Sequence, residues 1–450
     1  MKAVILAGGF GTRLRPLTYT LPKPMIPVLN RPELHYLIEK LAAAGFTEAI
    51  ITTNYMAEVI EHYMSKTDFG ISVRCIGEKT PLGGAGAVKN AEAFLDGDFA
   101  VLQSDSVSNM DLEALIAFHY QKKAVATLAV MEVEDTREFG IVQTDADGRI
   151  LRFQEKPKPE ESFSHLANTG FYIFDRKVLD DIPQDQFYDF SRDVFPKLLG
   201  ANQPMYAYRF NGFWLDIGTR VNSYLDGLFW LLGERAESGN VSMEKVQLTP
   251  PYLIGHNAQI AAGAVIGPHA IIGDNCTIGR DAVIKRSVLY DNVTLGAKVT
   301  LDQCVVADNN IIREGVAIGE FAIVGKGCVI GARTEVKSLS KVGPYCNVDS
   351  GITVDGVICP RTEMLSELQT MLTQYPAFQN LNQEQLKVCT LLAEFGELQA
   401  KTLSHLSNIP YSRIHQVLYG LEQANVVVSY GDVPKLFALK YEEPELIRRK

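Results

Sequence analysis

The chain has 450 residues, of which 46% are hydrophobic and 21% are charged. A chain of this length exceeds what one hydrophobic core usually spans, so we expect two or three folded domains, and the composition excludes a disordered or fibrous protein. With 43 basic against 53 acidic side chains the net charge is −10. This charge provides no global attraction to nucleic acid or to an anionic membrane.

The sequence shows no targeting or membrane-spanning segment. Gly8-Gly9 and charged residues follow the first apolar run too early for a signal peptide, and nowhere do 18 apolar residues run together. The seven cysteines are scattered and form no C-x-x-C pair, which favours reduced thiols over a disulfide framework or a structural zinc site. These features predict a soluble cytoplasmic protein without a membrane partner.

Residues 1–233 alternate β-rich apolar runs with helical patterns. Strands are predicted at 4–6, 49–53, 73–76, 100–103 and 126–132, helices at 34–44, 57–64 and 112–121, and a hairpin at 141–153 around Asp147-Gly148. Such alternation is typical of parallel strands joined by crossover helices. The region is therefore predicted to be an α/β domain with an open sheet.

Residues 250–360 have a six-residue period. Aliphatic residues recur at Ile254, Ile260, Ile266, Ile272, Ile278 and Ile284, with small residues at Ala258, Ala264, Ala270, Cys276 and Ala282. After a shift the ladder is expected to continue through Val293, Val299, Val305 and Ile311, and after a second shift through Ile318, Val324, Ile330, Val336, Val342, Val348 and Val354. This period predicts a parallel β-helix of roughly six coils, serving as a scaffold and homo-oligomer interface.

Residues 365–450 predict helices at 365–372, 383–395, 400–406 and 411–424, followed by strands at 426–429 and 436–439. Three helices and a hairpin within seventy residues are typical of a winged helix-turn-helix. Residues 370–445 resemble the winged-helix domain of TrmB-type transcription regulators. The resembling segments include Leu381-Asn382-Gln383-Glu384, Ile409-Pro410-Tyr411-Ser412 and Leu418-Tyr419-Gly420-Leu421.

The segment after the first strand carries the strongest chemical signal. It runs Leu6-Ala7-Gly8-Gly9-Phe10-Gly11-Thr12-Arg13-Leu14-Arg15-Pro16-Leu17-Thr18, and Leu21-Pro22-Lys23-Pro24 follows. The three glycines let backbone N–H groups approach a polyphosphate, and Arg13, Arg15 and Lys23 add positive charge. The segment lacks the third glycine of the dinucleotide fingerprint, and the chain has no G-K-[S/T] of a P-loop.

This signature resembles that of sugar-1-phosphate nucleotidylyltransferases, over about residues 1–233. The resemblance implies a Rossmann-like nucleotidyltransferase domain followed by a left-handed β-helix. It also implies that a sugar 1-phosphate oxygen attacks the α-phosphorus of a nucleoside triphosphate and that pyrophosphate leaves. Arg13 and Lys23 are then the expected catalytic residues. The expected nucleotide-binding residues are Leu6, Ala7, Gly8, Gly9, Gly11, Thr12, Gly83 and Gly86.

Two carboxylates are expected to hold Mg²⁺ against the triphosphate. Asp105 follows a predicted strand, at the sheet edge where open α/β sheets bind ligands, and Asp216 follows Gly212-Phe213-Trp214-Leu215. Their role comes from the resemblance, and carboxylate oxygens are the ligands that Mg²⁺ prefers. Ser104 stands where the family commonly has Gly, which puts the loop before Asp105 in question.

The resemblance also implies a sugar-phosphate site. Glu155-Lys156-Pro157 resembles the family's E-K-P motif, in which the lysine binds the phosphate and the glutamate binds sugar hydroxyls. Asn168 and Gly140 resemble the residues beside the sugar ring. Gln103 is expected to face the sugar or the base.

Within the family, three segments look most like mannose-1-phosphate guanylyltransferases. They are Asn54-Tyr55, Lys79-Thr80-Pro81-Leu82-Gly83 and Gly212-Phe213-Trp214-Leu215-Asp216-Ile217-Gly218. Mannose 1-phosphate and GTP are therefore the expected substrates. Glucose-1-phosphate thymidylyl- and uridylyltransferases share nearly all of these residues and are the alternative.

Two functions of other classes stay open. The β-helix could be an acyltransferase with His256 or His269 as general base. The C-terminal region could make the protein a DNA-binding regulator that responds to nucleotide sugars. Residues 361–450 carry nine basic and ten acidic residues, a net charge of −1, and only Arg413 and His415 of the predicted recognition helix could reach DNA. This balance does not favour DNA as a partner.

Overall fold

The computed structural model describes residues 1–9, 11–78, 80–218, 220–235, 245–358, 378, 380–395, 398–407, 409–424, 426–430 and 436–439. Internal contacts divide the chain into two units. The first comprises Met1–Phe10, Pro22–Met25 and Pro32–Asp216, and the second comprises Gly11–Leu21, Ile26–Arg31 and Ile217–Lys450.

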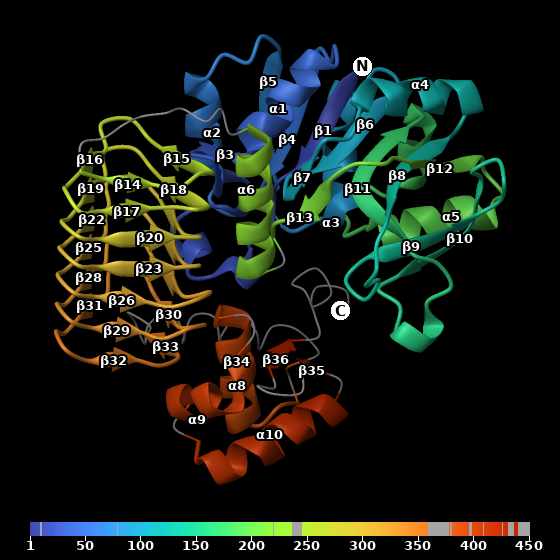
Figure 1. Cartoon of the computed structure of the whole chain (residues 1–450). Coiled ribbons are helices and arrows are strands. Elements are labelled where there is room, and N and C mark those ends of the chain that lie inside the picture. Colours follow the sequence, from blue (N-terminus) through green and yellow to red (C-terminus); the bar gives the residue numbers. More distant parts are fainter. Residues whose placement is uncertain are drawn as a thin grey trace. The chain divides into compact units, whose positions relative to one another are not determined.

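The first unit is built on a nine-stranded sheet with helices between its strands (Figure 1). The strand order is β10-β9-β11-β6-β1-β4-β5, with β8 paired to β11 and β12 paired to β8. The strands are β1 (Lys2–Leu6), β4 (Glu48–Thr53), β5 (Ser72–Gly77), β6 (Phe99–Gln103), β8 (Ala126–Glu132), β9 (Gly140–Thr144), β10 (Ile150–Glu155), β11 (Leu166–Phe174) and β12 (Met205–Arg209). The helices are α1 (Glu33–Ala43), α2 (Ala57–Lys66), α3 (Gly83–Asn90), α4 (Leu112–Lys122) and α5 (Phe195–Gly200).

The predicted parallel arrangement is confirmed for β1, β4, β5 and β6. Beyond β6 the sheet is mostly antiparallel. β9 and β10 form a hairpin, and β11 runs antiparallel to β6, β8 and β9. In helix α1 the spacing of the apolar residues determines which face is buried. Leu34, Leu37, Ile38 and Leu41 are buried at the spacing of one helix face. A further pair, β7 (Ser106–Ser108) and β13 (Trp214–Asp216), forms a two-stranded sheet.

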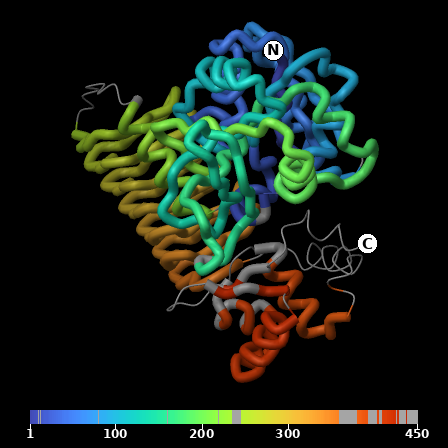
Figure 2. The backbone as a smooth tube through the Cα atoms, turned by 90° about the vertical axis from the view of Figure 1, so that its right-hand side faces the viewer, coloured from blue at the N-terminus to red at the C-terminus, as the bar shows by residue number. Residues whose placement is uncertain are grey.

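The second unit contains a parallel β-helix whose coils stack as regular rungs (Figures 1 and 2). Its three sheets have seven, seven and six strands in the described chain. The first sheet is β14 (Gln247–Leu248), β17 (Val265–Ile266), β20 (Val283–Lys285), β23 (Thr300–Asp302), β26 (Ala317–Ile318), β29 (Glu335–Val336) and β32 (Thr353–Val354). The second is β15 (Tyr252–Ile254), β18 (Ala270–Ile272), β21 (Val288–Leu289), β24 (Val305–Val306), β27 (Ile323–Val324), β30 (Lys341–Val342) and β33 (Val357–Ile358). The third is β16 (Gln259–Ile260), β19 (Thr277–Ile278), β22 (Thr294–Leu295), β25 (Ile311–Ile312), β28 (Val329–Ile330) and β31 (Asn347–Val348).

The predicted ladder is wrong in phase from Val293 to Ile311, whereas the strand register confirms its last part, from Ile318 to Val354. In the strand register Ile278 pairs with Leu295 and Ile284 pairs with Leu301, so leucines continue the interior column. Ile311 is 46% exposed, whereas its neighbour Ile312 is fully buried. The interior column after Ile284 is Leu289, Leu295, Leu301, Val306 and Ile312.

Two shortened corners cause this error. The interior residues are spaced by five rather than six where β20 leads to β21 and where β23 leads to β24. Aliphatic pairs such as Ile311-Ile312 fit either phase, so the sequence period alone cannot choose between them. The stack also begins at Gln247, three residues ahead of the predicted residue 250, so that β14 adds one strand to the first sheet.

The second unit also contains β2 (Pro27–Val28), which pairs with β3 (Arg31–Pro32), and helix α6 (Val221–Arg235). Its C-terminal part consists of α8 (Gln383–Phe395), β34 (Leu398–Gln399), α9 (Ala400–Ser407), α10 (Tyr411–Gln423), β35 (Val427–Tyr430) and β36 (Leu436–Leu439). The three strands form an antiparallel sheet in which β36 is central. Strand β34 was not predicted, and the predicted helix at 365–372 lies outside the described residues.

The described cysteines carry free thiols, and all of them except Cys75 are buried. Among the described residues, no helix combines the length and the apolar character needed to cross a membrane.

Candidate active site

The glycine-rich signature begins where β1 ends at Leu6. Ala7 N donates a hydrogen bond to a carbonyl of β4 at 3.1 Å, which holds the chain beside that strand for one residue more. A Cβ on Gly8 would lie 3.1 Å from Glu78 Oε1. At Gly9 no described atom lies within 4 Å of the Cβ position. The backbone at Gly9 is therefore open, as a phosphate-binding turn requires.

The catalytic arginine expected from the sequence lies in a short turn. Gly11 has a φ of +65°, and its carbonyl accepts hydrogen bonds from Leu14 N at 3.1 Å and from Thr18 Oγ1 at 2.8 Å. These bonds close a one-turn 3₁₀ helix, Thr12–Leu14, that carries Arg13. The turn belongs to the second unit, whereas Gly8 belongs to the first.

Lys23 and Asp105 form an ion pair inside the first unit. Lys23 begins a one-turn helix, Lys23–Met25, and its Nζ donates a hydrogen bond to Asp105 Oδ2. The side chains are only 13% and 18% exposed, so solvent screens the pair weakly. The other carboxylate oxygen, Asp105 Oδ1, is buried and has no hydrogen-bond partner among the described residues. This oxygen is therefore a buried polar atom that a bound cation could complete.

Asp216 lies beside Asp105 because their strands pair. Asp105 comes two residues after β6 and directly before β7, and Asp216 is the last residue of β13. The register of β7 and β13 sets Asp216 opposite Ser106. The structure therefore brings the two predicted metal carboxylates to one sheet edge, although they are far apart in sequence.

Asn109 fixes the turn that leads into β13. Its Oδ1 accepts a hydrogen bond from Phe213 N at 2.6 Å, and its backbone N donates to Phe213 O at 3.1 Å. The Asn109 side chain also occupies the space that a Cβ on Gly212 would need. This clamp positions Asp216, and sequence analysis missed Asn109 because a single asparagine in a loop gives no signal.

Glu33 is a second residue that sequence analysis missed. It follows Pro32 at the start of α1, is 4% exposed, and has an Oε1 atom without a hydrogen-bond partner in the described chain. Burial raises the pKa of Glu33 well above its usual value, Asp105 and Asp216 raise it further, and Lys23 opposes the shift. Glu33 therefore belongs to the same charged cluster. In the sequence it resembles an ordinary acidic residue at a helix N-terminus.

Gly140 and Glu155 meet across the β9–β10 hairpin, as the sugar-site prediction requires. The register pairs the two residues, and a Cβ on Gly140 would lie 2.7 Å from Glu155 Oε2. Lys156 follows at the end of β10 with a φ of +41°, and its backbone N donates to Phe139 O at 3.0 Å. The hairpin thus places the glutamate and the lysine of the E-K-P motif at one end of the strands.

Asn168 is held by protein groups. Its Nδ2 donates to Tyr172 Oη at 2.8 Å, and its Oδ1 accepts from Gly170 N at 3.2 Å. Gly170 has a φ of +79°, and a Cβ there would lie 2.8 Å from Gln103 Cδ. Gln103 therefore lies against the segment predicted to orient the sugar. The Asn168 amide stabilises that segment through its own bonds.

An aromatic pair lies beside these groups. Phe139, directly before Gly140, and Trp214, two residues before Asp216, contact each other edge to face with centroids 5.0 Å apart. Trp214 Nε1 is buried and has no hydrogen-bond partner among the described residues. The sequence contained the tryptophan in a matching segment but gave no indication of this pairing.

Gly83 and Gly86 make close packing contacts. Gly83 has a φ of +70° at the start of α3, and a Cβ there would lie 2.6 Å from Tyr188 O. A Cβ on Gly86 would lie 2.6 Å from Gln186 O. These glycines let α3 approach the segment at 186–188, which accounts for their presence whether or not they also contact a nucleobase.

Ser104 fits its position without disturbing the loop before Asp105. Its Oγ donates a hydrogen bond to Leu6 O at 2.7 Å and ties the end of β6 to the end of β1. The departure from the family's usual glycine therefore adds a tie between two strands that carry site residues.

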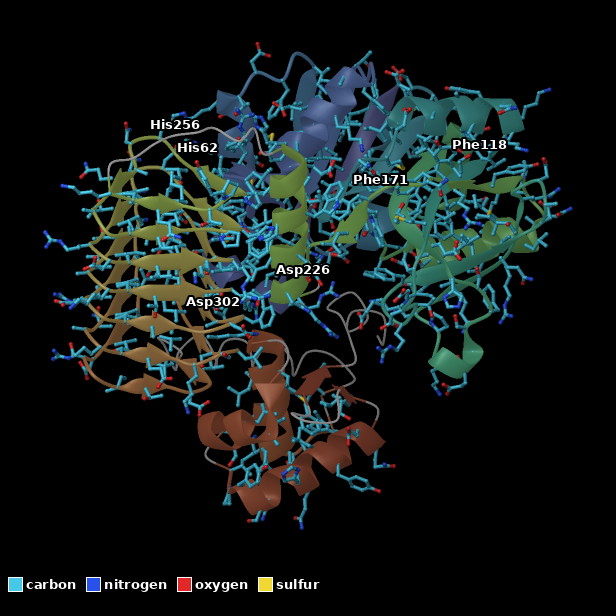
Figure 3. All side chains as sticks on the ribbon, viewed as in Figure 1. His62, Phe118, Phe171, Asp226, His256 and Asp302 are labelled. Atoms are coloured by element: carbon cyan, nitrogen blue, oxygen red, sulfur yellow. The ribbon has the colours of Figure 1, made fainter. Side chains whose placement is uncertain are left out.

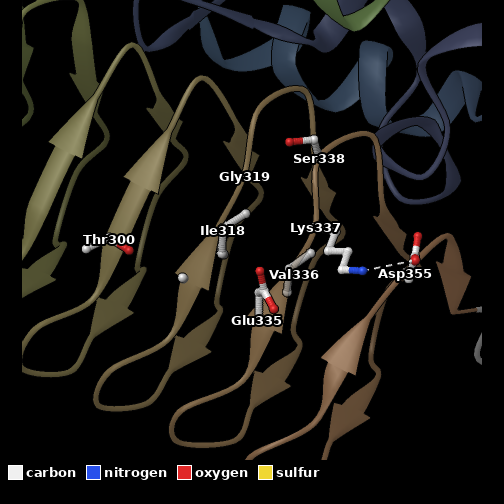
Figure 4. Close-up of a pocket in the computed structure, with 9 residues that line it drawn as sticks. Thr300, Ile318, Gly319, Glu335, Val336, Lys337, Ser338 and Asp355 are labelled. Carbon is white, nitrogen blue, oxygen red and sulfur yellow. Dashed lines mark hydrogen bonds and ion pairs between the residues drawn. The ribbon is translucent and has the colours of Figure 1, made fainter.

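The β-helix histidines are not assembled into a catalytic site. The His256 side chain is 91% exposed at a corner of the stack, with Nδ1 at 3.2 Å from Asp274 Oδ1 (Figure 3). His269 lies at another corner with a φ of +58° and packs against Phe229, and burial lowers its pKa. A cavity of about 470 Å³ on the β-helix is lined by Thr300, Ala317, Ile318, Gly319, Glu335, Val336, Lys337, Ser338 and Asp355 (Figure 4). Neither histidine lines it, so this cavity does not support an acyltransferase.

The two C-terminal side chains that could reach DNA contact neighbouring side chains of the protein. Arg413 Nε donates to Glu384 Oε2 at 2.9 Å, and His415 contacts Tyr411 edge to face with centroids 5.0 Å apart. These contacts do not favour the DNA-binding regulator.

Comparison with known proteins agrees with the site. Residues 2–229 match the family model described as nucleotidyl transferase, and residues 236–336 match the EIF2B subunit epsilon LbH domain, a left-handed β-helix. The chain therefore belongs to the nucleotidyl transferase family.

Curated relatives narrow the activity. The UTP–glucose-1-phosphate uridylyltransferase of Synechocystis is 38% identical over 272 residues, which cover 57% of this chain and 69% of that protein. The mannose-1-phosphate guanyltransferase of Gibberella zeae is 35% identical over 272 residues, covering 59% and 73%. The mannose-1-phosphate guanylyltransferase of Mycobacterium tuberculosis is 35% identical over 278 residues, covering 60% and 77%. The chain is a sugar-1-phosphate nucleotidyltransferase, an enzyme that uses a nucleoside triphosphate and a sugar phosphate.

Proposed function

We propose that this enzyme transfers a guanylyl group from GTP to mannose 1-phosphate and forms GDP-mannose and pyrophosphate. The guanylyltransferase relatives support this choice. An oxygen of the sugar 1-phosphate forms a bond to the α-phosphorus of GTP, the bond from that phosphorus to the bridging oxygen breaks, and pyrophosphate leaves with the electron pair. The uridylyltransferase relative supports glucose 1-phosphate with UTP as the alternative pair.

The charged cluster of Lys23, Asp105 and Asp216 is the observation that carries the proposal. Lys23 would hold positive charge near the leaving pyrophosphate, and Arg13 would bind the triphosphate. Open backbone at the signature would receive phosphate oxygens. The nucleotide-binding set would be Leu6, Ala7, Gly8, Gly9, Gly11, Thr12, Gly83 and Gly86. The sugar-phosphate set would be Gly140, Glu155, Lys156 and Asn168.

The proposed metal is Mg²⁺, and the residues present fit it. Asp105 keeps one buried carboxylate oxygen without a partner among the described residues, and Asp216 comes from the strand beside it. Oxygen ligands of this kind are those that Mg²⁺ prefers. When bound, Mg²⁺ would neutralise charge on the phosphate oxygens.

We also propose three folded domains, residues 1–233, 250–360 and 365–450, and a homo-oligomer formed through the β-helix. The order helix, strand, helix, helix, strand, strand supports a winged helix-turn-helix for the last domain. Light scattering of the full chain tests the oligomer. The mass of a monomer at micromolar concentration would contradict it.

Pyrophosphate release tests the substrates. The purified protein is assayed with Mg²⁺ and each of GTP, dTTP, UTP, CTP and ATP, combined with mannose, glucose, galactose and N-acetylglucosamine 1-phosphates. We expect the highest kcat/KM for GTP with mannose 1-phosphate. A preference for UTP or dTTP with glucose 1-phosphate would replace that pair by the alternative.

A further inference from the structure

The segments that carry the proposed catalytic residues belong to different units. Gly11–Leu21, which carries Arg13, and Ile26–Arg31 belong to the unit that contains the β-helix. Pro22–Met25, which carries Lys23, belongs to the first unit, and the chain returns to that unit at Pro32. The chain thus alternates between the units within its first 32 residues. The short β2–β3 hairpin lies between Lys23 and Glu33 in sequence.

Three side chains hold this β2–β3 hairpin to the rest of the second unit. Asn30 Nδ2 donates to Ile272 O of β18 at 2.9 Å. Tyr224 Oη, from α6, donates to Pro27 O at 2.5 Å and lies 3.0 Å from Tyr290 Oη. Because the Tyr224 proton goes to Pro27 O, Tyr290 is the donor in the tyrosine pair. The hairpin is therefore bonded directly to the β-helix and, through Tyr224, to a second β-helix residue.

The two tyrosines are buried at 0% and 4% exposure, and burial raises the pKa of each hydroxyl, so both stay protonated and able to donate at neutral pH. The turn that they support is strained. Leu29 and Asn30 have φ values of +47° and +65°, a left-handed pair that a two-residue hairpin turn requires but that a leucine adopts rarely. Such a turn persists where surrounding contacts fix it.

We propose that Asn30, Tyr224 and Tyr290 are positioning residues for nucleotidyl transfer, a role that rests on the proposed function of Lys23. They fix the β2–β3 hairpin within the second unit, and because Ile26 directly follows Met25, the hairpin restrains the chain that carries Lys23. The β-helix then supports catalysis directly, in addition to acting as a scaffold. None of the three residues touches substrate in this account.

The test compares two variants with matched controls in the full-length protein. Tyr224→Phe removes the hydroxyl and keeps the ring, and Asn30→Gly removes the amide and keeps a residue that tolerates a positive φ. Tyr345→Phe changes a tyrosine that is 61% exposed, and Asn309→Gly changes an exposed β-helix asparagine with a φ of +59°. We expect kcat to fall about fivefold to tenfold in the first two variants, the equivalent of one hydrogen bond, with KM within about twofold. The controls should match the wild type.

A double variant separates positioning from a general structural effect. If Tyr224 acts through Lys23, Tyr224→Phe should have no further effect on kcat in a Lys23→Ala background. Hydrogen exchange of residues 11–31 should be faster in Tyr224→Phe than in Tyr345→Phe, while the thermal midpoint stays within about 2 °C. Unchanged kcat, an additive double variant, or a loss of kcat that tracks a lower midpoint would each overturn the proposal.

Failure of the proposed substrates can be distinguished from failure of the positioning proposal. If the wild type prefers another nucleotide and sugar phosphate, the variants are measured with that pair and the same expectations hold. If the wild type turns over no pair, hydrogen exchange decides. Faster exchange of residues 11–31 in Tyr224→Phe supports the anchoring of the hairpin, and unchanged exchange contradicts it.

Discussion

The β-helix interior and the sheet edge of the first unit, which is the nucleotidyltransferase unit, differ in how their buried polar atoms are hydrogen-bonded. Inside the β-helix, Asn310 is fully buried, and its Nδ2 donates to Ala307 O at 2.7 Å and to Gly325 O at 2.9 Å. Its Oδ1 accepts from Cys328 N at 2.7 Å. At the sheet edge of the first unit, Glu33 Oε1 and Asp105 Oδ1 are buried without partners among the described residues.

This difference in hydrogen bonding distinguishes a structural region from a binding site. A buried polar atom without a hydrogen-bond partner lowers the free energy of unfolding by about 1–3 kcal/mol. In a purely structural region nothing offsets this loss. A binding site can bear the cost because the ligand supplies the missing partner. On this comparison the region around Asp105 is where a ligand completes the structure, and the β-helix interior is complete by itself.

The largest effect should come from removing a proposed metal carboxylate. Asp216→Asn removes a charge that would hold the cation, so kcat/KM should fall by about 10³ or more in pyrophosphate release. Asp147→Asn is the matched control, because Asp147 is 70% exposed and pairs with Lys122 on the surface. Equal rates for the two variants would remove Asp216 from the site.

The next effect tests the corrected interior of the β-helix. Ile312→Ala should lower the free energy of unfolding by about 2–5 kcal/mol, since it leaves a cavity in a closed core. Ile311→Ala should cost less than about 1 kcal/mol, because Ile311 is 46% exposed. Urea denaturation of both variants measures the difference. The reverse order would restore the ladder that the sequence period predicted.

A smaller effect tests the sugar side of the site. Gly140→Ala places a methyl group 2.7 Å from Glu155 Oε2 and 2.6 Å from Phe153 Cζ, so the glutamate must move. We expect KM for the sugar 1-phosphate to rise about tenfold and KM for the nucleotide to stay within about twofold. Steady-state kinetics with each substrate varied in turn distinguishes them. A rise in KM for the nucleotide alone would contradict the assignment of Gly140 and Glu155 to the sugar.

The smallest effect concerns stacked aspartates at one corner of the β-helix. Asp274 N donates to Asp291 Oδ1, and Asp291 N donates to Asp308 Oδ1. Burial raises the pKa of Asp308, Lys326 opposes the shift, and Asp291 adds to it. A folded-state pKa above the unfolded value means that the protonated form stabilises the fold at low pH and that this stability is lost as pH rises through the folded pKa.

Asp308→Asn keeps an acceptor for Asp291 N and removes the charge. The variant should gain a few tenths of a kcal/mol of stability over the wild type at pH 8 and less at pH 4. Thermal denaturation at the two pH values measures this difference. A gain that is larger at pH 4 would show that the carboxylate is favourably paired.

The predictability of the two regions differs for a physical reason. In the β-helix each coil contacts its neighbours along a fixed period, so Ile254 to Ile284 were assigned correctly from sequence alone. The predicted ladder was wrong only after a corner that is one residue shorter. Either residue of an aliphatic pair such as Val305-Val306 fits the interior, so the sequence does not reveal that the corner is shorter.

In the first unit the predicted strands and hairpin match β1, β4, β5, β6, β8, β9 and β10 to within a few residues, but the sequence did not predict β11, β12 or the pair of β7 and β13. The sequence did not indicate that Lys23 pairs with Asp105, that Glu33 is buried among them, or that Asn109 clamps the turn before Asp216. These contacts depend on sheet topology. Residues from several segments meet only when β6, β7 and β13 are in place.

The Mg²⁺ dependence of turnover shows whether Asp105 holds the catalytic cation. Pyrophosphate release from GTP and mannose 1-phosphate is followed as Mg²⁺ is titrated, with the wild type and with Asp105→Asn. The account predicts turnover that saturates with Mg²⁺ in the wild type and a loss of about 10³ or more in kcat/KM in the variant. Near-equal rates in the two proteins would show that the carboxylate with the unpartnered oxygen does not hold the catalytic cation.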